Sequence, residues 1–121
     1  MSRVLVVDDE EDFRKLARRL LEADGHEVIE AASGQEGIDQ FRAMAPEIVV
    51  TDIVMPGKSG IEAIEAIRQE NPTVRIIAIS GNGDVASSGF LGTALKVGAD
   101  RALAKPFRAD EFLAALAPEE V

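Results

Sequence analysis

Short, continuous apolar runs alternate along this chain with longer segments in which apolar residues recur at helical spacing. A continuous run such as Val4–Val7 is typical of a parallel strand that is covered on both faces. The segment that follows carries Phe13, Leu16 and Leu20 at intervals of three and four, which predicts an amphipathic helix that stops near Gly25. This strand-then-helix order is the feature that most constrains the fold.

The same pattern recurs to the end of the chain. Further strands are expected to begin at residue 28 and to cover 47–52, 74–80 and 101–105. Further helices are expected after the capping-box patterns Ser33–Glu36 and Ser59–Glu62, and over 85–97 and 109–117. Five β–α units in a row predict one α/β domain with a doubly wound parallel sheet in strand order 2-1-3-4-5. With no linker or repeat, the domain is expected to fill residues 1–121.

Composition limits the chemistry that the domain can carry. The 121 residues are 46% hydrophobic but only 4% aromatic, so the core is expected to be aliphatic. The chain has no cysteine and one histidine, His26, which excludes thiolate chemistry, disulfides and a multi-histidine metal centre. A formal net charge of −9 argues against direct binding of nucleic acid. With neither signal peptide nor membrane span in the sequence, we expect a soluble, cytoplasmic protein.

Polar side chains gather at the carboxyl ends of the predicted strands. Asp8 and Asp9 follow the first strand, Asp52 ends the third, Ser80 ends the fourth and Lys105 ends the fifth. In strand order 2-1-3-4-5 the first and third strands are neighbours, and the chain reverses direction between them. Ligands of open α/β sheets bind in the crevice at such a point. We therefore expect the three aspartates to face one another there.

The three carboxylates repel one another unless a cation lies between them. At about 4 Å and an effective dielectric constant near 20, each pair costs about 4 kcal/mol before screening. Lys105 supplies only one positive charge. Because the available ligands are oxygens, a hard ion such as Mg²⁺ fits better than zinc.

A phosphoryl group supported by Mg²⁺ needs further partners, and the same crevice offers them. Asp52 can accept the group through a carboxylate oxygen. Lys105 can neutralise the phosphoryl oxygens, and the Ser80 hydroxyl can donate a hydrogen bond to one of them.

Motifs along the whole chain resemble those of the receiver domain of two-component response regulators. The matching stretches are VVDDE, TDIVMPG, ISG, GAD and KPF, in this order and spacing. The resemblance implies a flavodoxin-like (βα)5 fold with Asp52 as the phosphoacceptor. It implies that Mg²⁺ is bound by Asp8, Asp9, Asp52 and the backbone carbonyl of Val54. Ser80 and Lys105 match the residues that contact the phosphoryl group.

The resemblance also implies partners and moving parts. A phosphohistidine on a sensor histidine kinase or phosphotransfer protein would be the phosphodonor, and a downstream protein would be the target. The peptide bond before Pro106 would be cis. The family usually has Tyr or Phe three residues before the lysine, but this chain has Ala102, so a rotating ring is unavailable. We expect phosphorylation to change instead the surface around the fourth helix and fifth strand, through the loop at 81–83.

Alternatives remain open at the level of sequence. A stand-alone receiver, monomeric or weakly dimeric, that catalyses only its own phosphorylation and dephosphorylation is favoured over a piece of a longer regulator or hybrid kinase. A different class of protein, a small Mg²⁺-dependent aspartyl phosphohydrolase, would have Asp-x-Asp on the first strand, whereas this chain has adjacent aspartates. Glu10 is interpreted as a charge that suits a helix N-terminus. Thr51 is interpreted as a satisfied buried hydroxyl, Met55 and Phe107 as packing residues, and His26 as inert.

Overall fold

The structure is a computed structural model that describes the chain except residues 1, 56, 58, 82–86, 106 and 118–121, and that describes only the backbone of residues 87–91. The strands are β1 (Arg3–Val7), β2 (Glu27–Ala31), β3 (Ile48–Asp52), β4 (Arg75–Ser80) and β5 (Arg101–Ala104). The helices are α1 (Glu11–Ala23), α2 (Gly34–Met44), α3 (Gly60–Glu70), α4 (Ser87–Val97) and α5 (Ala109–Leu116). Strands and helices alternate strictly, as the apolar pattern predicts.

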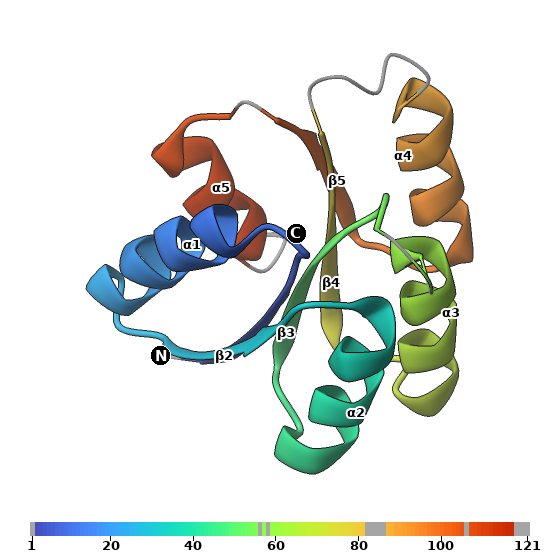
Figure 1. Cartoon of the computed structure of the whole chain (residues 1–121), viewed down its shortest axis with the longest axis horizontal. Helices are drawn as coiled ribbons and strands as arrows, with labels where there is room; N and C mark the ends of the chain where they lie inside the picture. Colours follow the sequence, from blue (N-terminus) through green and yellow to red (C-terminus); the bar gives the residue numbers. More distant parts are fainter. Residues whose placement is uncertain (1, 56, 58, 82–86, 106, 118–121) are drawn as a thin grey trace.

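The five strands form one parallel sheet in the order β2-β1-β3-β4-β5 (Figure 1). This confirms the predicted fold class and strand order. The central pairing sets Val7 on β1 beside Thr51 on β3. The residues that follow these two, Asp8 and Asp52, therefore emerge at the same edge of the sheet.

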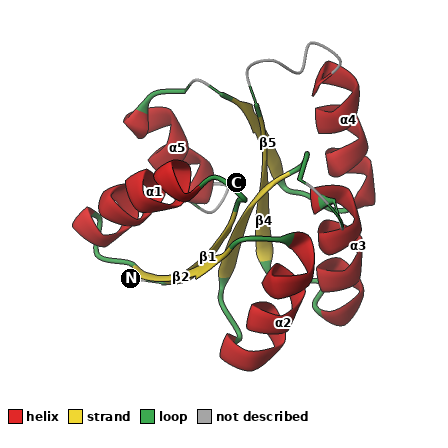
Figure 2. Ribbon diagram, in the orientation of Figure 1, coloured by secondary structure: helices red, strands yellow, loops and turns green. Residues whose placement is uncertain are grey.

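Helices cover both faces of the sheet (Figure 2). Helices α1 and α5 lie on one face, and α2, α3 and α4 lie on the other. Each face has its own cluster of buried side chains, one around Leu5, Val49 and Ile64 and the other around Val6 and Ile77. Because the strand residues of both clusters are Val, Ile, Leu and Ala, the expectation of an aliphatic core is confirmed.

The helix boundaries follow local signals in the sequence. Ser59 and Glu62 form the predicted capping box before α3. Before α2 the Ser33 hydroxyl accepts from the Glu36 amide, but the Glu36 carboxylate accepts from the amide of Ala32 rather than that of Ser33. The reciprocal half of the predicted box at Ser33 is therefore shifted by one residue. Gly25, with φ +90°, follows α1 as expected.

Two sequence-based expectations concern segments outside the described residues. Pro106 is one of them, so its expected cis bond stays a prediction. The loop expected to move on phosphorylation includes residues 82 and 83, which are also outside the described part. Helix α4 is described from Ser87, two residues after the predicted start.

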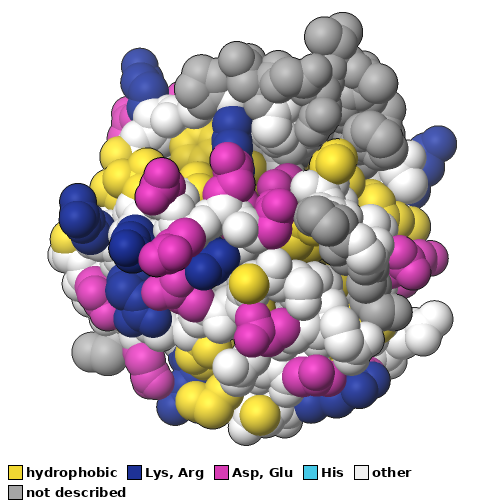
Figure 3. Space-filling view, viewed as in Figure 1, with side chains coloured by type: hydrophobic (Ala, Val, Ile, Leu, Met, Phe, Trp, Pro, Cys, Tyr) yellow, Lys and Arg dark blue, Asp and Glu magenta, His cyan; other side chains and the backbone are white. Residues whose placement is uncertain are grey.

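The described surface carries many paired charges. Arg14 and Arg18 on α1 both form ion pairs with Glu30 on β2, and Arg18 also contacts Glu22. Figure 3 shows basic and acidic side chains interleaved over α1. Among the described helices, none combines the length and the hydropathy that crossing a membrane requires.

Candidate functional site

Four of the predicted site residues come together at the carboxyl edge of the sheet. Asp8 follows β1, Asp52 ends β3, Ser80 ends β4 and Lys105 follows β5. Asp8 and Ser80 are fully buried, and Asp52 is 6% exposed. Ionisable side chains are seldom buried unless they are paired or functional. The fold thus concentrates buried charge at the point where the sequence predicts a ligand crevice.

Backbone contacts hold Asp8 in place. Its amide donates to the carbonyl of Ala31 at 3.0 Å, and its Oδ1 accepts from the amide of Glu10 at 2.9 Å. The Asp8 carbonyl accepts from Nη1 of Arg14 at 2.7 Å. Because these contacts come from β2, from the next turn and from α1, the Asp8 carboxylate has a defined direction.

Asp52 is positioned by the start of α3. Its carbonyl accepts from the Thr51 hydroxyl at 2.9 Å, so Thr51 is the satisfied buried hydroxyl that the sequence predicts. The Asp52 Oδ1 lies 3.4 Å from the amide of Val54. Gly60 lies so close that a Cβ atom on it would come 1.9 Å from the Asp52 carbonyl oxygen. The backbone around Asp52 is therefore confined on the side facing α3.

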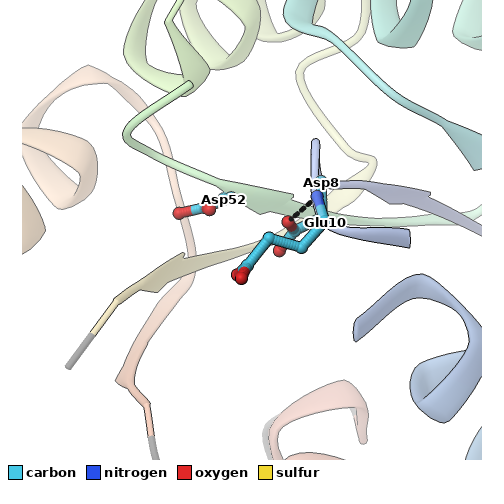
Figure 4. Close-up of side chains that lie close together, drawn as sticks. All are labelled: Asp8, Glu10 and Asp52. Carbon is cyan, nitrogen blue, oxygen red and sulfur yellow. Dashed lines mark hydrogen bonds between the residues drawn. The ribbon is translucent and has the colours of Figure 1, made fainter. Parts of the chain in front are cut away.

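Three acidic side chains converge in the crevice. The group consists of Asp8, Glu10 and Asp52, each of which offers a carboxylate oxygen within 4.8 Å of the others (Figure 4). Asp9, which was predicted to face Asp52 together with Asp8, is exposed and lies outside this group. The prediction that Glu10 serves only the helix N-terminus was incomplete, because its carboxylate belongs to the converging group. The sequence signal for it is the third acid of the DDE run.

Lys105, which follows the edge strand β5, contacts the acidic group through its side chain. Its Nζ lies 2.9 Å from Oδ2 of Asp8 and 3.3 Å from Oε1 of Glu10. Its backbone amide donates to the carbonyl of Ser80 at 2.7 Å, which ties the end of β5 to the end of β4. Burial lowers the pKa of Lys105, but the hydrogen bond to Asp8 and the charges of Asp8 and Asp52 outweigh it and raise this pKa overall. Lys105 is therefore a cation in the crevice.

The two aspartates in the crevice also have raised pKa values, which for a carboxyl group favours the uncharged form. Burial raises the pKa of Asp52 to about 6, the charge of Asp8 adds to the increase, and Lys105 partly offsets it. Burial also raises the pKa of Asp8, against the hydrogen bonds from Glu10 and Lys105. Ionising both aspartates thus costs free energy in the absence of a further cation.

The donor set fits a hard divalent cation. All three converging groups are carboxylates, and two of them belong to buried residues. Mg²⁺ prefers such oxygen ligands and retains several waters. Lys105 adds one positive charge against three negative ones, so the group keeps an excess of negative charge. The residues present therefore suit Mg²⁺, with room in its shell for a ligand oxygen.

The raised pKa of Asp52 predicts a pH-dependent gain in stability when its charge is removed. A carboxyl group whose pKa is higher in the folded state contributes less stability as pH rises through that pKa. In EDTA at pH 7, Asp52→Asn should raise the free energy of unfolding by about 1–3 kcal/mol. The gain should shrink as pH falls from 6 toward 4, where Asp52 takes up its proton. Urea unfolding at several pH values measures this, and an equal gain at pH 4 and pH 7 would contradict the assignment.

Other residues singled out in the sequence have clear positions. Ala102 is a partly buried residue of β5 that pairs with Ala78. Met55 is buried in the cluster around Leu5, Val49 and Ile64, and Phe107 packs against the cluster on the face that α1 and α5 cover. His26 precedes β2 at the opposite end of the sheet, where its Nδ1 accepts from the amide of Ser2 at 3.1 Å.

Known proteins with similar sequences point to one family. The family model described as "Response regulator receiver domain" matches residues 4–117. The chemotaxis protein CheY of Thermotoga maritima is 36% identical over 116 residues, which are 95% of this chain and 94% of CheY. The acid tolerance regulatory protein ActR of Rhizobium meliloti is 39% identical over 93% of this chain, which corresponds to 57% of ActR.

Solved structures agree in fold. A response regulator receiver domain protein from Clostridium thermocellum superposes with a TM-score of 0.86 at 33% identity, covering 96% of this chain and 91% of that protein. NtrX from Brucella abortus superposes with a TM-score of 0.84 at 30% identity, covering 95% of this chain and 27% of NtrX. With the match of the family model over nearly the whole chain, these likenesses show that the chain belongs to the response regulator receiver domain family, the signalling modules of two-component systems.

Proposed function

We propose that this receiver domain is a phosphorylation-dependent switch in which Asp52 accepts a phosphoryl group from a phosphohistidine of a sensor kinase or phosphotransfer protein. The observation that carries the proposal is the buried Asp52 carboxylate, which lies beside Asp8 and Glu10 and near the Lys105 ammonium at the carboxyl edge of the sheet. Membership of the family supports the class of donor. The raised pKa of Asp52 means that burial and the charge of Asp8 destabilise its ionised carboxylate. Bonding to phosphorus or binding of a cation nearby would relieve this destabilisation, which supports Asp52 as the acceptor.

In the proposed reaction an Asp52 carboxylate oxygen attacks phosphorus while the bond from phosphorus to the donor imidazole breaks. The imidazole leaves with the bonding electron pair, and an acyl phosphate remains on Asp52. Lys105 balances the charge of the phosphoryl oxygens, and the Ser80 hydroxyl donates to one of them. When bound, Mg²⁺ supplies charge neutralisation for these oxygens. Asp8 and Asp52, with Asp9, Glu10 and the Val54 carbonyl as further candidate ligands, would hold the ion.

Transfer from a labelled kinase tests the proposal. A histidine kinase domain carrying a radioactive phosphohistidine is mixed with this chain and Mg²⁺, and label on both proteins is followed over time. We expect label to move to this chain until it reaches at most one phosphoryl group per molecule. Repeated turnover of a phosphate ester with no labelled protein would instead identify a phosphohydrolase.

We further propose that residues 1–121 form one receiver domain that acts without an attached output domain. The proposal is supported by the match to CheY of Thermotoga maritima over 94% of that protein. In this role the domain, as a monomer or weak dimer, would present its altered surface around α4 and β5 to a separate target protein. Sedimentation of the domain with and without acetyl phosphate measures its state of association. A stable dimer in both conditions would contradict this part.

Binding of Mg²⁺ to the acidic group should stabilise the folded domain. At ten times its dissociation constant, an ion that binds only the folded state adds about 1.4 kcal/mol to the free energy of unfolding. Asp9→Ala is expected to weaken this response, as the resemblance implies. Glu10→Gln is the matched comparison, because Glu10 lies in the converging group.

Thermal unfolding with increasing MgCl₂ measures both responses. Asp39→Asn, which changes an exposed acid on α2, serves as the control for general charge effects. If only Glu10→Gln reduces the response, Glu10 and not Asp9 supplies the third carboxylate. A wild-type melting temperature that does not change with Mg²⁺ would contradict the metal site.

A further inference from the structure

The Lys105 ammonium has an uncharged partner that the proposed chemistry does not use. Its Nζ lies 4.0 Å from the centroid of the Phe13 ring, in addition to its contacts with Asp8 and Glu10. A cation over the face of an aromatic ring is attracted by the ring quadrupole. The Lys105 side chain is only 15% exposed, so solvent screens this attraction incompletely.

Other phenylalanines fix the ring of Phe13. Its plane is nearly perpendicular to the rings of Phe107 and Phe112, with centroids 6.1 and 6.5 Å away. Phe107 and Phe112 are themselves stacked, with centroids 5.4 Å apart. Edge-to-face and offset-stacked contacts of this kind stabilise defined ring orientations. Residues from α1, from the segment after β5 and from α5 thus present one ring face to Lys105.

The Phe13 ring differs from the other partners of Lys105 in how it responds to a metal ion. Among the contacts of Nζ within the described residues, the two carboxylates, Asp8 and Glu10, both belong to the group that suits Mg²⁺. A divalent ion bound to these oxygens neutralises their negative charge and repels the Lys105 ammonium. The ring is not a ligand for Mg²⁺, so its attraction for the ammonium persists.

We propose that Phe13 is a positioning residue that keeps the Lys105 ammonium in the crevice when a divalent cation occupies the acidic group. This inference rests on the proposed phosphoryl transfer to Asp52. With Lys105 held beside the acceptor, its charge is already in place when the phosphoryl group arrives. Phe13 touches neither phosphorus nor Asp52 in this role and acts through Lys105.

Rates of labelling by acetyl phosphate in saturating Mg²⁺ test the proposal, with intact mass as the readout. Phe13→Leu and Phe13→Met remove the ring and keep an apolar side chain, so the rate should fall about five-fold, as a partly buried cation–π contact allows. Phe13→Tyr keeps the ring and should retain the rate. Leu20→Ala is the matched control, because Leu20 is, like Phe13, a partly buried apolar residue of α1 that packs on the same core cluster, but it is not one of the three rings. In a Lys105→Ala background, Phe13→Leu should have no further effect.

A second readout does not depend on labelling. The ring current of Phe13 should shift the Cε protons of Lys105 upfield in the NMR spectrum, and this shift should persist on saturation with Mg²⁺. Loss of the shift on adding Mg²⁺ would overturn the inference, as would an unchanged rate in Phe13→Leu or an equal fall in Leu20→Ala. If wild-type protein is not labelled at all, the proposed function fails and the inference fails with it. If wild-type protein is labelled and the Phe13 variants are labelled at the same rate, the proposed function stands and the inference alone fails.

Discussion

Asp52→Asn should abolish labelling by acetyl phosphate in the presence of Mg²⁺. The amide has no anionic oxygen to attack phosphorus, while its shape is close to that of the carboxylate. Asp52 is also the member of the acidic group that ends β3 and is not engaged by Lys105 within the described contacts. Asp8 is already committed to the Glu10 amide and to Lys105. Loss of label should therefore be complete within the detection limit of intact-mass measurement.

Asp39→Asn provides the control for this loss. Asp39 is an exposed acid on α2, hydrogen-bonded to Gln35. Its variant should label at the wild-type rate, because it changes the net charge equally and leaves the crevice intact. Labelling of Asp52→Asn at the wild-type rate would place the acceptor elsewhere.

Gly60→Ala should lower the free energy of unfolding by about 3 kcal/mol or more, at the upper end of the cost of overpacking. The added Cβ would lie 1.9 Å from the Asp52 carbonyl oxygen and 2.7 Å from Cα of Ile53, so backbone must move. A flexible side chain could give way cheaply, but a strand-end carbonyl cannot. Because the displaced atoms include those of Asp52, labelling should also slow.

Gly92→Ala is the matched control for this substitution. Gly92 lies within α4, and a Cβ atom there would meet nothing within 4 Å. Alanine in a helix interior is favoured over glycine by about 0.5–1 kcal/mol, so this variant should be slightly more stable than wild type. Urea unfolding measures both variants. Equal effects of the two substitutions would contradict the close approach of α3 to Asp52.

The fold was predictable because the same pattern, a continuous apolar run followed by apolar residues at helical spacing, recurs along the whole sequence. Continuous runs such as Val4–Val7 mark buried parallel strands, and the order of strands follows from connection rules rather than from individual contacts. The meeting of Asp8 and Asp52 follows directly from that order, since residues after neighbouring parallel strands leave the sheet together. The position of Lys105 at the same edge was predictable because it follows β5, which is parallel to the other strands.

The direction of individual side chains was not predictable. Asp9 and Glu10 are successive acids, and the turn after β1 decides which of them points into the crevice. The contact between Phe13 and Lys105 joins residues far apart in the sequence through a cluster of three rings, and apolar spacing indicates only that Phe13 faces inward. The shifted box at Ser33 similarly depends on the rotamer of Glu36. Such details arise from packing, which pattern alone does not determine.

Chemical mapping of the phosphoryl group tests the central claim most directly. Protein labelled with acetyl phosphate is reduced with borohydride, which converts an aspartyl phosphate to homoserine, and is then cut with trypsin. Cleavage after Arg42 and Lys58 isolates a peptide in which Asp52 is the only aspartate, whereas Asp8 and Asp9 fall in the peptide that ends at Arg14. We expect homoserine at position 52. Homoserine in the peptide that ends at Arg14, with Asp52 unmodified, would contradict the account.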